Sequence, residues 1–256
     1  MTRLNVVAMV TVALIGTPLQ AQMRVDNADL WLTASASVGT FTVANEGTEV
    51  LQFTLENADW DRAEDGANRF YPAGSTPSSC ERALEVFPRQ LRLTAGASQT
   101  VRVSLRADSL PSRACWSLVF VQTEPPQAQQ RSSAVRYVTR IGVKIYYTPP
   151  QTVTLAEIEG FVQLPKVAPQ DSNAVELAVR NTGTRPVGLE GTVEIRRADN
   201  FVVARIPVET IPVLPAALRR IRVNLPKLDP GVYVALAVFD YGADEDLAAQ
   251  TPVEIR

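Results

Sequence analysis

Apolar and polar residues alternate along most of this chain in short runs, a pattern typical of strands with one buried face. Glycine, proline, asparagine and aspartate separate the runs, as expected of turns. No stretch shows a convincing helical period, so we predict an all-β protein. The strands predicted for the first half cover 41–43, 50–55, 83–87, 90–93, 100–105, 115–122 and 134–149.

The second half repeats this organisation. Its predicted strands cover 153–158, 174–180, 188–196, 201–207, 218–225, 232–239 and 252–255. About seven short strands per hundred or so residues is typical of an immunoglobulin-like sandwich. Two prolines at 149 and 150 interrupt strand pairing between the halves. We therefore predict two tandem immunoglobulin-like β-sandwich domains, over 22–148 and 149–256, with a stiff joint and a fixed cleft between them.

The run at 134–149 is the longest of these predicted strands. One face carries Val135, Tyr137, Thr139, Ile141 and Val143, and the other carries Arg136, Arg140 and Lys144. Strands average about five or six residues. We therefore expect this one to extend beyond its own sheet, where a mixed apolar and basic strand could pair with another polypeptide.

The first residues resemble an export signal. Arg3 precedes an apolar run at 6–15, and a breaker and a small residue, Ala21, follow. The alternative, a membrane anchor, would need roughly 20 apolar residues, which this run lacks. We predict a signal peptide over 1–21, cleaved after Ala21, and no stable membrane insertion.

Export makes the two cysteines informative. Cys80 lies in a loop rich in serine, proline and glycine, and Cys115 begins an apolar strand. In an oxidising compartment such a pair is more often a disulfide than two free thiols. The alternative, a redox-active pair, lacks the Cys-X-X-Cys spacing. We predict a disulfide that ties the loop to the core.

Composition narrows the function. The 256 residues carry a net charge of −2, so nothing favours nucleic acid as a partner. The chain has no histidine, which argues against Ser-His-Asp and Cys-His hydrolases and against typical catalytic zinc sites. We expect no enzyme activity and no cofactor or metal. Two acidic groups lack the spacing of a calcium-binding loop and are interpreted as exposed turns. One consists of Asp59, Asp61, Glu64 and Asp65, and the other covers Asp244 to Asp246.

Several segments, in order, resemble the PapD-like periplasmic chaperones of the chaperone/usher pathway. They are FTVANEG at 41–47, VFP at 86–88, QTVRV at 99–103, CWSLVF at 115–120 and IGVKIYYTP at 141–149. The resemblance covers roughly 25–150. It implies a periplasmic chaperone that holds incomplete pilus or fimbrial-type subunits by donor-strand complementation and passes them to an outer-membrane usher.

The resemblance also implies residue roles. Lys144 is similar in position to the lysine that binds the carboxylate at the C-terminus of the subunit, and Val135, Tyr137, Thr139 and Ile141 to the donor side chains. The family's second basic residue, an arginine on the first strand, is missing, because 30–43 contains no basic residue. Arg24 and Arg140 are the candidate substitutes, although neither matches by motif.

Other interpretations of the same residues stay open. Lys144 could be a solvated strand lysine, and the apolar face of its strand could belong only to its own core. The main alternative function is a structural or adhesive tandem immunoglobulin-like module of the cell envelope. A carbohydrate-binding or carboxylate-based enzyme accessory domain is a third.

Overall fold

The computed structural model describes residues 23–124, 138–166, 168 and 172–256. Within them the regular elements are strands, apart from one short 3-10 turn, η1 (Ala107–Ser109), so the all-β prediction is confirmed. The predicted signal peptide and two predicted donor residues, Val135 and Tyr137, lie outside the described residues.

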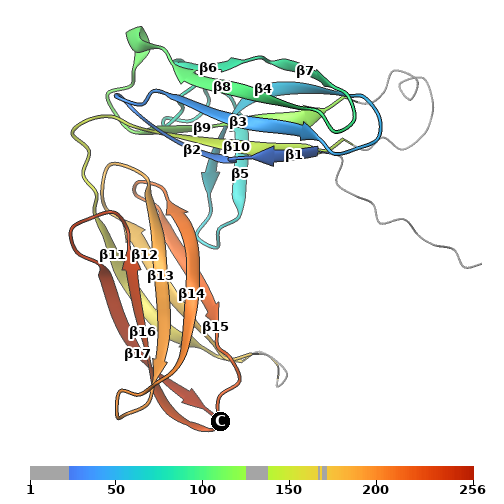
Figure 1. The fold of residues 1–256 in the computed structure, drawn as a ribbon. Coiled ribbons are helices and arrows are strands. Elements are labelled where there is room, and N and C mark those ends of the chain that lie inside the picture. The colour runs from blue at the N-terminus through green and yellow to red at the C-terminus, as the bar shows by residue number, and fades with distance from the viewer. Residues whose placement is uncertain (1–22, 125–137, 167, 169–171) are drawn as a thin grey trace, which may run out of the picture.

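The first ten strands form two sheets packed face to face, the N-terminal sandwich (Figure 1). One sheet has the order β1-β3-β8-β6. The other has the order β2-β10-β9-β4-β5, with β7 paired to β4. The strands are β1 (Met23–Asp26), β2 (Asp29–Thr33), β3 (Val38–Asn45), β4 (Leu51–Arg62), β5 (Asn68–Pro72), β6 (Leu84–Phe87), β7 (Gln90–Leu93), β8 (Ser98–Leu105), β9 (Cys115–Thr123) and β10 (Arg140–Thr148).

Alternate residues of these strands fill the space between the two sheets. Phe41 and Val43 on β3 face Phe53 and Leu55 on β4, and each is at most 3% exposed. The predicted disulfide between Cys80 and Cys115 is present in this core, with the sulfurs 2.07 Å apart. The period-two pattern therefore builds one apolar layer, and the disulfide ties the loop before β6 to it.

The N-terminal segment that contains β1 and β2 crosses from one sheet to the other. β1 pairs with β3, whereas β2 pairs in parallel with β10. Between them Asn27 adopts φ 61°, a left-handed conformation that asparagine tolerates, and its side-chain amide donates to the carbonyl of Thr40 at 2.8 Å. Because β2 begins at Asp29, its pairing with β10 begins only at Lys144.

The last seven strands form the C-terminal sandwich. Its sheets have the orders β11-β12-β15 and β14-β13-β16-β17. The side chain of Gln163 exchanges hydrogen bonds with the backbone of Glu254, joining the two sheets. The strands are β11 (Ala156–Leu164), β12 (Ala174–Asn181), β13 (Val187–Arg196), β14 (Val202–Val213), β15 (Leu218–Asn224), β16 (Gly231–Asp240) and β17 (Leu247–Ile255).

The structure corrects several strand predictions. β4 continues to Arg62 and forms a hairpin with β5, where we expected only acidic turns. β11 covers Ala156–Leu164 rather than 153–158, and β10 begins at Arg140, later than the predicted start at 134. Aspartate, asparagine and proline are disfavoured in strands, so they hid the hairpin, which cross-strand pairs stabilise.

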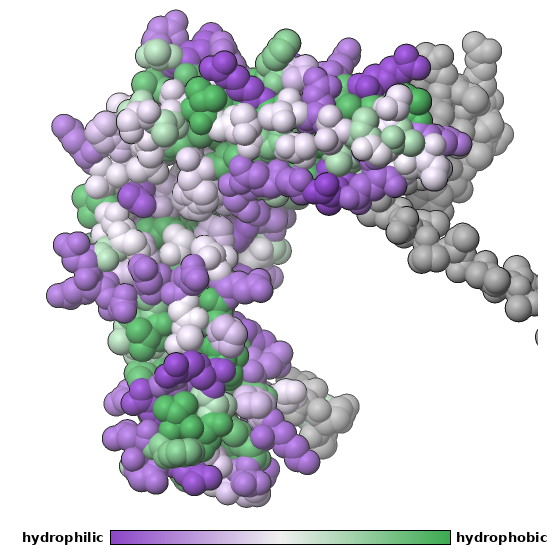
Figure 2. All heavy atoms as spheres, viewed as in Figure 1, coloured by the Kyte–Doolittle hydropathy of each residue, from purple (hydrophilic) through white to green (hydrophobic). Residues whose placement is uncertain are grey.

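The two sandwiches meet at an angle, and the β4–β5 hairpin projects from the first toward the second (Figure 1). The sheets of the N-terminal sandwich end at Thr148 and those of the C-terminal one start at Ala156, so a boundary at 148/149 stays a prediction. Figure 2 shows a hollow beside the junction and hydrophilic residues over much of both bodies. Among the described residues, no helix is long and apolar enough to span a membrane.

Candidate functional site

The two faces of β10 have different surroundings. Ile141, Val143, Ile145 and Tyr147 face the core of the N-terminal sandwich, the last three at 1% exposure or less. Arg140, Lys144 and Tyr146 lie on the opposite, outer face of the sheet, as the alternation predicts. Lys144 therefore lies on the outer face of a strand that is paired with β9 and β2.

Lys144 is largely covered, with 19% of its side chain exposed. Its Nζ lies 4.0 Å from Oδ1 of Asp29 and 5.3 Å from the centroid of a Trp60 ring. Burial lowers the pKa of Lys144 below its ordinary value, Asp29 opposes this change, and the nearby cation Arg62 adds to it. An anion that bound beside Lys144 would favour its charged form.

An apolar cluster covers the outer face around Lys144. This outer cluster consists of Ala58, Trp60, Trp116, Leu118, Phe120, Tyr146 and Leu214, the last from the C-terminal sandwich. Trp31 of β2 stacks on Tyr146 with ring centroids 4.1 Å apart, and Trp60 meets the same ring edge-on at 5.7 Å. Burial raises the pKa of Tyr146, with Asp29 adding to the effect. The Nζ atom of Lys144 thus lies beside a cluster of buried aromatic side chains.

Arg62 is a second cationic side chain near Trp60. Its guanidinium lies 5.3 Å from the centroid of a Trp60 ring, the residue that Lys144 also approaches. It donates to Asn68 Oδ1 at 3.1 Å and to the carbonyl of Pro212 at 3.5 Å. In the described part of the chain, no carboxylate accepts a hydrogen bond from Arg62.

Neither sequence candidate for the missing basic residue lies beside Lys144. Arg24 pairs with Asp26 and, at 2.6 Å, with Glu46. The Arg140 guanidinium lies 3.4 Å from the centroid of the Phe120 ring. On β2, the residue paired with Lys144 is the acidic Asp29. Arg62, which the sequence analysis did not consider, approaches Trp60, as Lys144 does.

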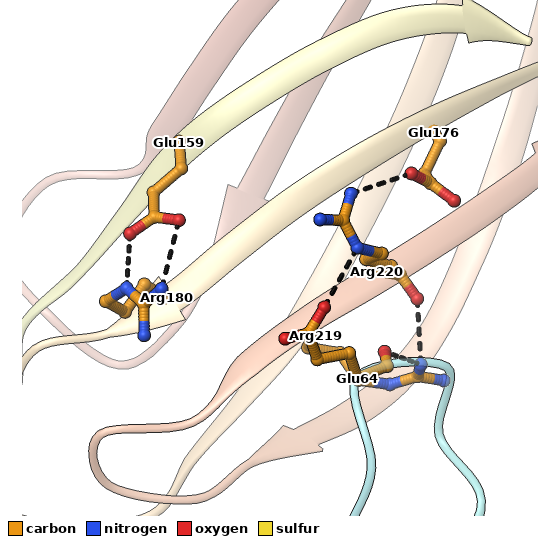
Figure 3. A network of polar contacts seen from close by, with 6 residues as sticks. All are labelled: Glu64, Glu159, Glu176, Arg180, Arg219 and Arg220. Carbon is orange, nitrogen blue, oxygen red and sulfur yellow. Dashed lines mark hydrogen bonds and ion pairs between the residues drawn. The ribbon is translucent and has the colours of Figure 1, made fainter.

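The β4–β5 hairpin also joins the two sandwiches (Figure 3). The Glu64 carboxylate accepts from Nε of Arg220 at 3.0 Å, and the Glu64 carbonyl accepts from the Arg220 backbone at 2.8 Å and from Arg219 Nη1 at 2.7 Å. A recess of about 300 Å³, lined by residues that include Arg62, Trp116 and Leu214, lies at this junction.

Asp59 and Asp61, which were interpreted from the sequence as parts of exposed turns, have hydrogen-bond and ion-pair partners within the protein. Asp59 is fully buried and accepts hydrogen bonds from Thr76, Ser79 and Ser117. Asp61 pairs with Arg69 at 2.7 Å. Asp59 fastens the disulfide loop to β4, and Asp61 stabilises the hairpin.

Two predicted donor residues fall within the described residues. Ile141 is partly buried and packs against the core of its own sandwich. Thr139 is exposed, and its backbone N–H donates to the hydroxyl of Thr123 at 3.0 Å. Their donor roles stay predictions.

Comparison with solved structures identifies the architecture. A chain of a chaperone–tip adhesin complex from CFA/I fimbriae biogenesis matches with a TM-score of 0.52 and 12% identity, over 92% of this chain and 100% of that one. The class 5 fimbriae chaperone CfaA matches with a TM-score of 0.51 and 10% identity, over 91% of this chain and all of CfaA. This chain has the fold of the fimbrial chaperones. No family model and no curated protein matches the sequence.

The match to the fimbrial chaperone fold covers both sandwiches, so the predicted tandem immunoglobulin-like architecture is confirmed. Arg62 and Trp60 are additions to that prediction. Extending the alternation of β4 beyond residue 55 would have placed both on the face opposite Asp59 and Asp61. The aspartates at 59 and 61 are disfavoured in strands and therefore indicated a turn there.

Proposed function

We propose that this protein is a periplasmic chaperone that binds incomplete pilus or fimbrial-type subunits by lending them a strand. One observation carries the proposal. Among the described residues, β10 pairs with β9 from Arg140 onwards but with β2 only from Lys144 onwards. Within the part of the chain that the structure describes, no strand pairs with this edge of β10 over 140–143, next to Lys144.

An unpaired strand edge offers backbone N–H and C=O groups to another chain. In β-augmentation these groups supply hydrogen bonds along the strand, while alternate side chains enter the partner's core and supply specificity. In this proposal the donor side chains are Val135, Tyr137, Thr139 and Ile141. The fimbrial chaperone fold supports the same function.

Lys144 would bind the carboxylate at the C-terminus of the subunit. A charge-assisted hydrogen bond is strongest where water is scarce, and the Lys144 ammonium lies largely covered above Trp60. Binding there would fix the register between β10 and the subunit strand, because the subunit chain ends at the lysine. The subunit would then pass to an outer-membrane usher without a nucleotide or metal cofactor, and the protein would not be an enzyme.

Affinity purification tests this function. A C-terminally tagged full-length copy is expressed in the native host, and proteins that co-purify from the periplasm are identified by mass spectrometry. We expect a small β-rich subunit in equal amount, lost with Lys144→Ala. The matched control is Lys227→Ala, because Lys227 is an exposed lysine of the C-terminal sandwich.

Full subunit retention by folded Lys144→Ala protein would exclude the anchoring role. Recovery of the tagged protein without a partner, or mainly at the cell surface, would favour a structural or adhesive module instead.

A further inference from the structure

The two sheets of the C-terminal sandwich are joined along one long side only. On that side β11 lies beside β17, and Gln163 exchanges hydrogen bonds with the backbone of Glu254. Along the opposite side, which we call the open side, β14 and β15 each end their sheet (Figure 1). Among the described residues, no hydrogen bond joins β14 to β15. The open side therefore presents two strand edges.

The sheets are also unequal, because one has three strands and the other has four. With β11 placed beside β17, the smaller sheet does not fully cover β14 at the other end. The burial of neighbouring strands shows this difference. Val193 and Ile195 of β13 are fully buried, whereas Val203 and Ile206 of β14 pack against the same core but stay partly exposed. The inner face of β14 is thus incompletely covered.

A hollow of about 560 Å³ lies on the open side. It is lined by 203–207 of β14 and by 224–228, which is the end of β15 and the loop after it. Val203, Ile206 and Leu225 belong to this lining and contact the core, so the hollow has an apolar floor. Its described lining residues include no carboxylate. The hollow therefore suits an apolar segment and would not repel an acidic one.

The free edge of β15 begins beyond Arg220. The backbone N–H of Arg220 donates to the carbonyl of Glu64 at 2.8 Å, outside the ladder with β12. Because N–H groups along an antiparallel strand alternate between its two edges, those of Arg222 and Asn224 point the same way. In the described part of the chain, neither has a partner on that side. Asn224 also lines the hollow, so the free donors border it.

Arg222 adds a charge to this edge. Its side chain is exposed on the outer face of the sheet, opposite the buried Ile221 and Val223. Its Nε donates to Oδ1 of Asn224 at 3.2 Å, and no carboxylate pairs with it among the described residues. A further strand on this edge would place alternate side chains beside Arg222 and over the hollow. The first set is best acidic and the second apolar.

We propose that the open side of the C-terminal sandwich is a docking groove for an extended segment of a partner protein in which apolar and acidic residues alternate. The segment pairs with β15 beyond Arg220, covers Val203 and Ile206 with its apolar side chains and turns its carboxylates toward Arg222. β14 is the less suitable edge, because Pro207 has no N–H to donate. The inference does not depend on the proposed function, since it uses neither β10 nor Lys144.

Defined peptides test this groove. Peptides with blocked ends, about six residues long like a typical strand, alternate valine with glutamate, valine with lysine, or serine with glutamate. Each is titrated into ¹⁵N-labelled protein comprising 22–256, and the backbone amide signals are followed by NMR. We expect the valine–glutamate peptide to shift the amides of Arg222 and Asn224 most. The other two should bind roughly fivefold more weakly or worse, because one repels Arg222 and the other cannot cover the apolar floor.

Charge reversal at Arg222 tests the acidic preference. Arg222→Glu should bind the valine–lysine peptide more tightly than the valine–glutamate peptide, the reverse of wild type. A purely structural role of Arg222 would not reverse this order. The matched control is Arg102→Glu, because Arg102 is an exposed arginine of β8 that forms no ion pair within the described residues. It should keep the wild-type preference.

Several outcomes would overturn the groove. If no peptide binds, or all bind equally, Arg222 only protects a strand edge from aggregation. Amide shifts confined to β10 would place the peptide on the other sandwich and contradict the proposal. A dimer in sedimentation that Arg222→Glu dissociates would make the occupant a second copy, which also contradicts it. If Arg222→Glu does not fold, the order of the peptides on wild-type protein decides.

Discussion

Asn45 and Asn181 hold equivalent positions in the two sandwiches. Asn45 is the last residue of β3 and Asn181 the last residue of β12, and each is at most 1% exposed. The Asn45 side chain donates to the carbonyls of Glu49 and Leu93 and accepts from Gly47. Asn181 donates to the carbonyls of Arg185 and Val213 and accepts from Gly183. The same corner is thus built twice.

These corners should be important for stability. Asn45→Ala and Asn181→Ala each remove the side-chain donor to one buried carbonyl, of Leu93 or Val213, and to one part-buried carbonyl, at a cost of about 1 to 3 kcal/mol per buried group left unpaired. We expect each substitution to lower the free energy of unfolding by about 3 kcal/mol, measured by urea denaturation. The exposed Asn224→Ala is the control. A change as small as that of the control would show that the corners are not stabilising.

Asp59 predicts a second, local effect. Replacing it with alanine removes the acceptor shared by Thr76, Ser79 and Ser117, two of which hold the disulfide loop. We expect a loss of about 3 kcal/mol in unfolding free energy, because buried donors are left unpaired. Asp61→Ala, at a partly exposed ion pair, should cost about 1 kcal/mol or less. Similar losses for both would contradict this role of Asp59.

Lys144 should contribute little stability to the unbound protein. Because burial lowers its pKa in the folded state, the unfolded chain holds the proton more tightly, so the lysine destabilises the fold at neutral pH. This cost is relieved as the pH rises from the folded pKa toward the ordinary value of 10.5. Lys144→Met should therefore unfold at the same or a higher urea concentration than wild type at pH 7, with a smaller difference at pH 10.

The control for this comparison is Lys227→Met at an exposed position. A marked loss of stability in Lys144→Met at pH 7 would mean that contacts of the ammonium with Asp29 and Trp60 outweigh its burial.

Strand alternation and turn residues were sufficient to predict two sandwiches from the sequence. The inward face of β10 follows directly from the period of two at Ile141, Val143 and Ile145. The cysteine pair could be predicted because the expected export signal made a disulfide the expected state.

The site was only partly predictable. Lys144 was found through a resemblance of motifs, but its neighbours come from distant parts of the chain: Asp29 from β2, Trp60 from β4 and Leu214 from the other sandwich. Arg62 was missed because its strand contains aspartates that favour turns in isolation. Contacts across a junction between domains leave no periodic pattern in the sequence.

The most direct test of the central claim is photo-crosslinking at the donor strand in living cells. A benzophenone amino acid replaces Thr139, which is exposed, and, as a control, Val232, which is 71% exposed on the C-terminal sandwich. We predict that Thr139 crosslinks to a single small β-rich subunit in the periplasm and that Val232 does not. No adduct at Thr139, or the same adducts at both positions, would contradict a strand-lending chaperone.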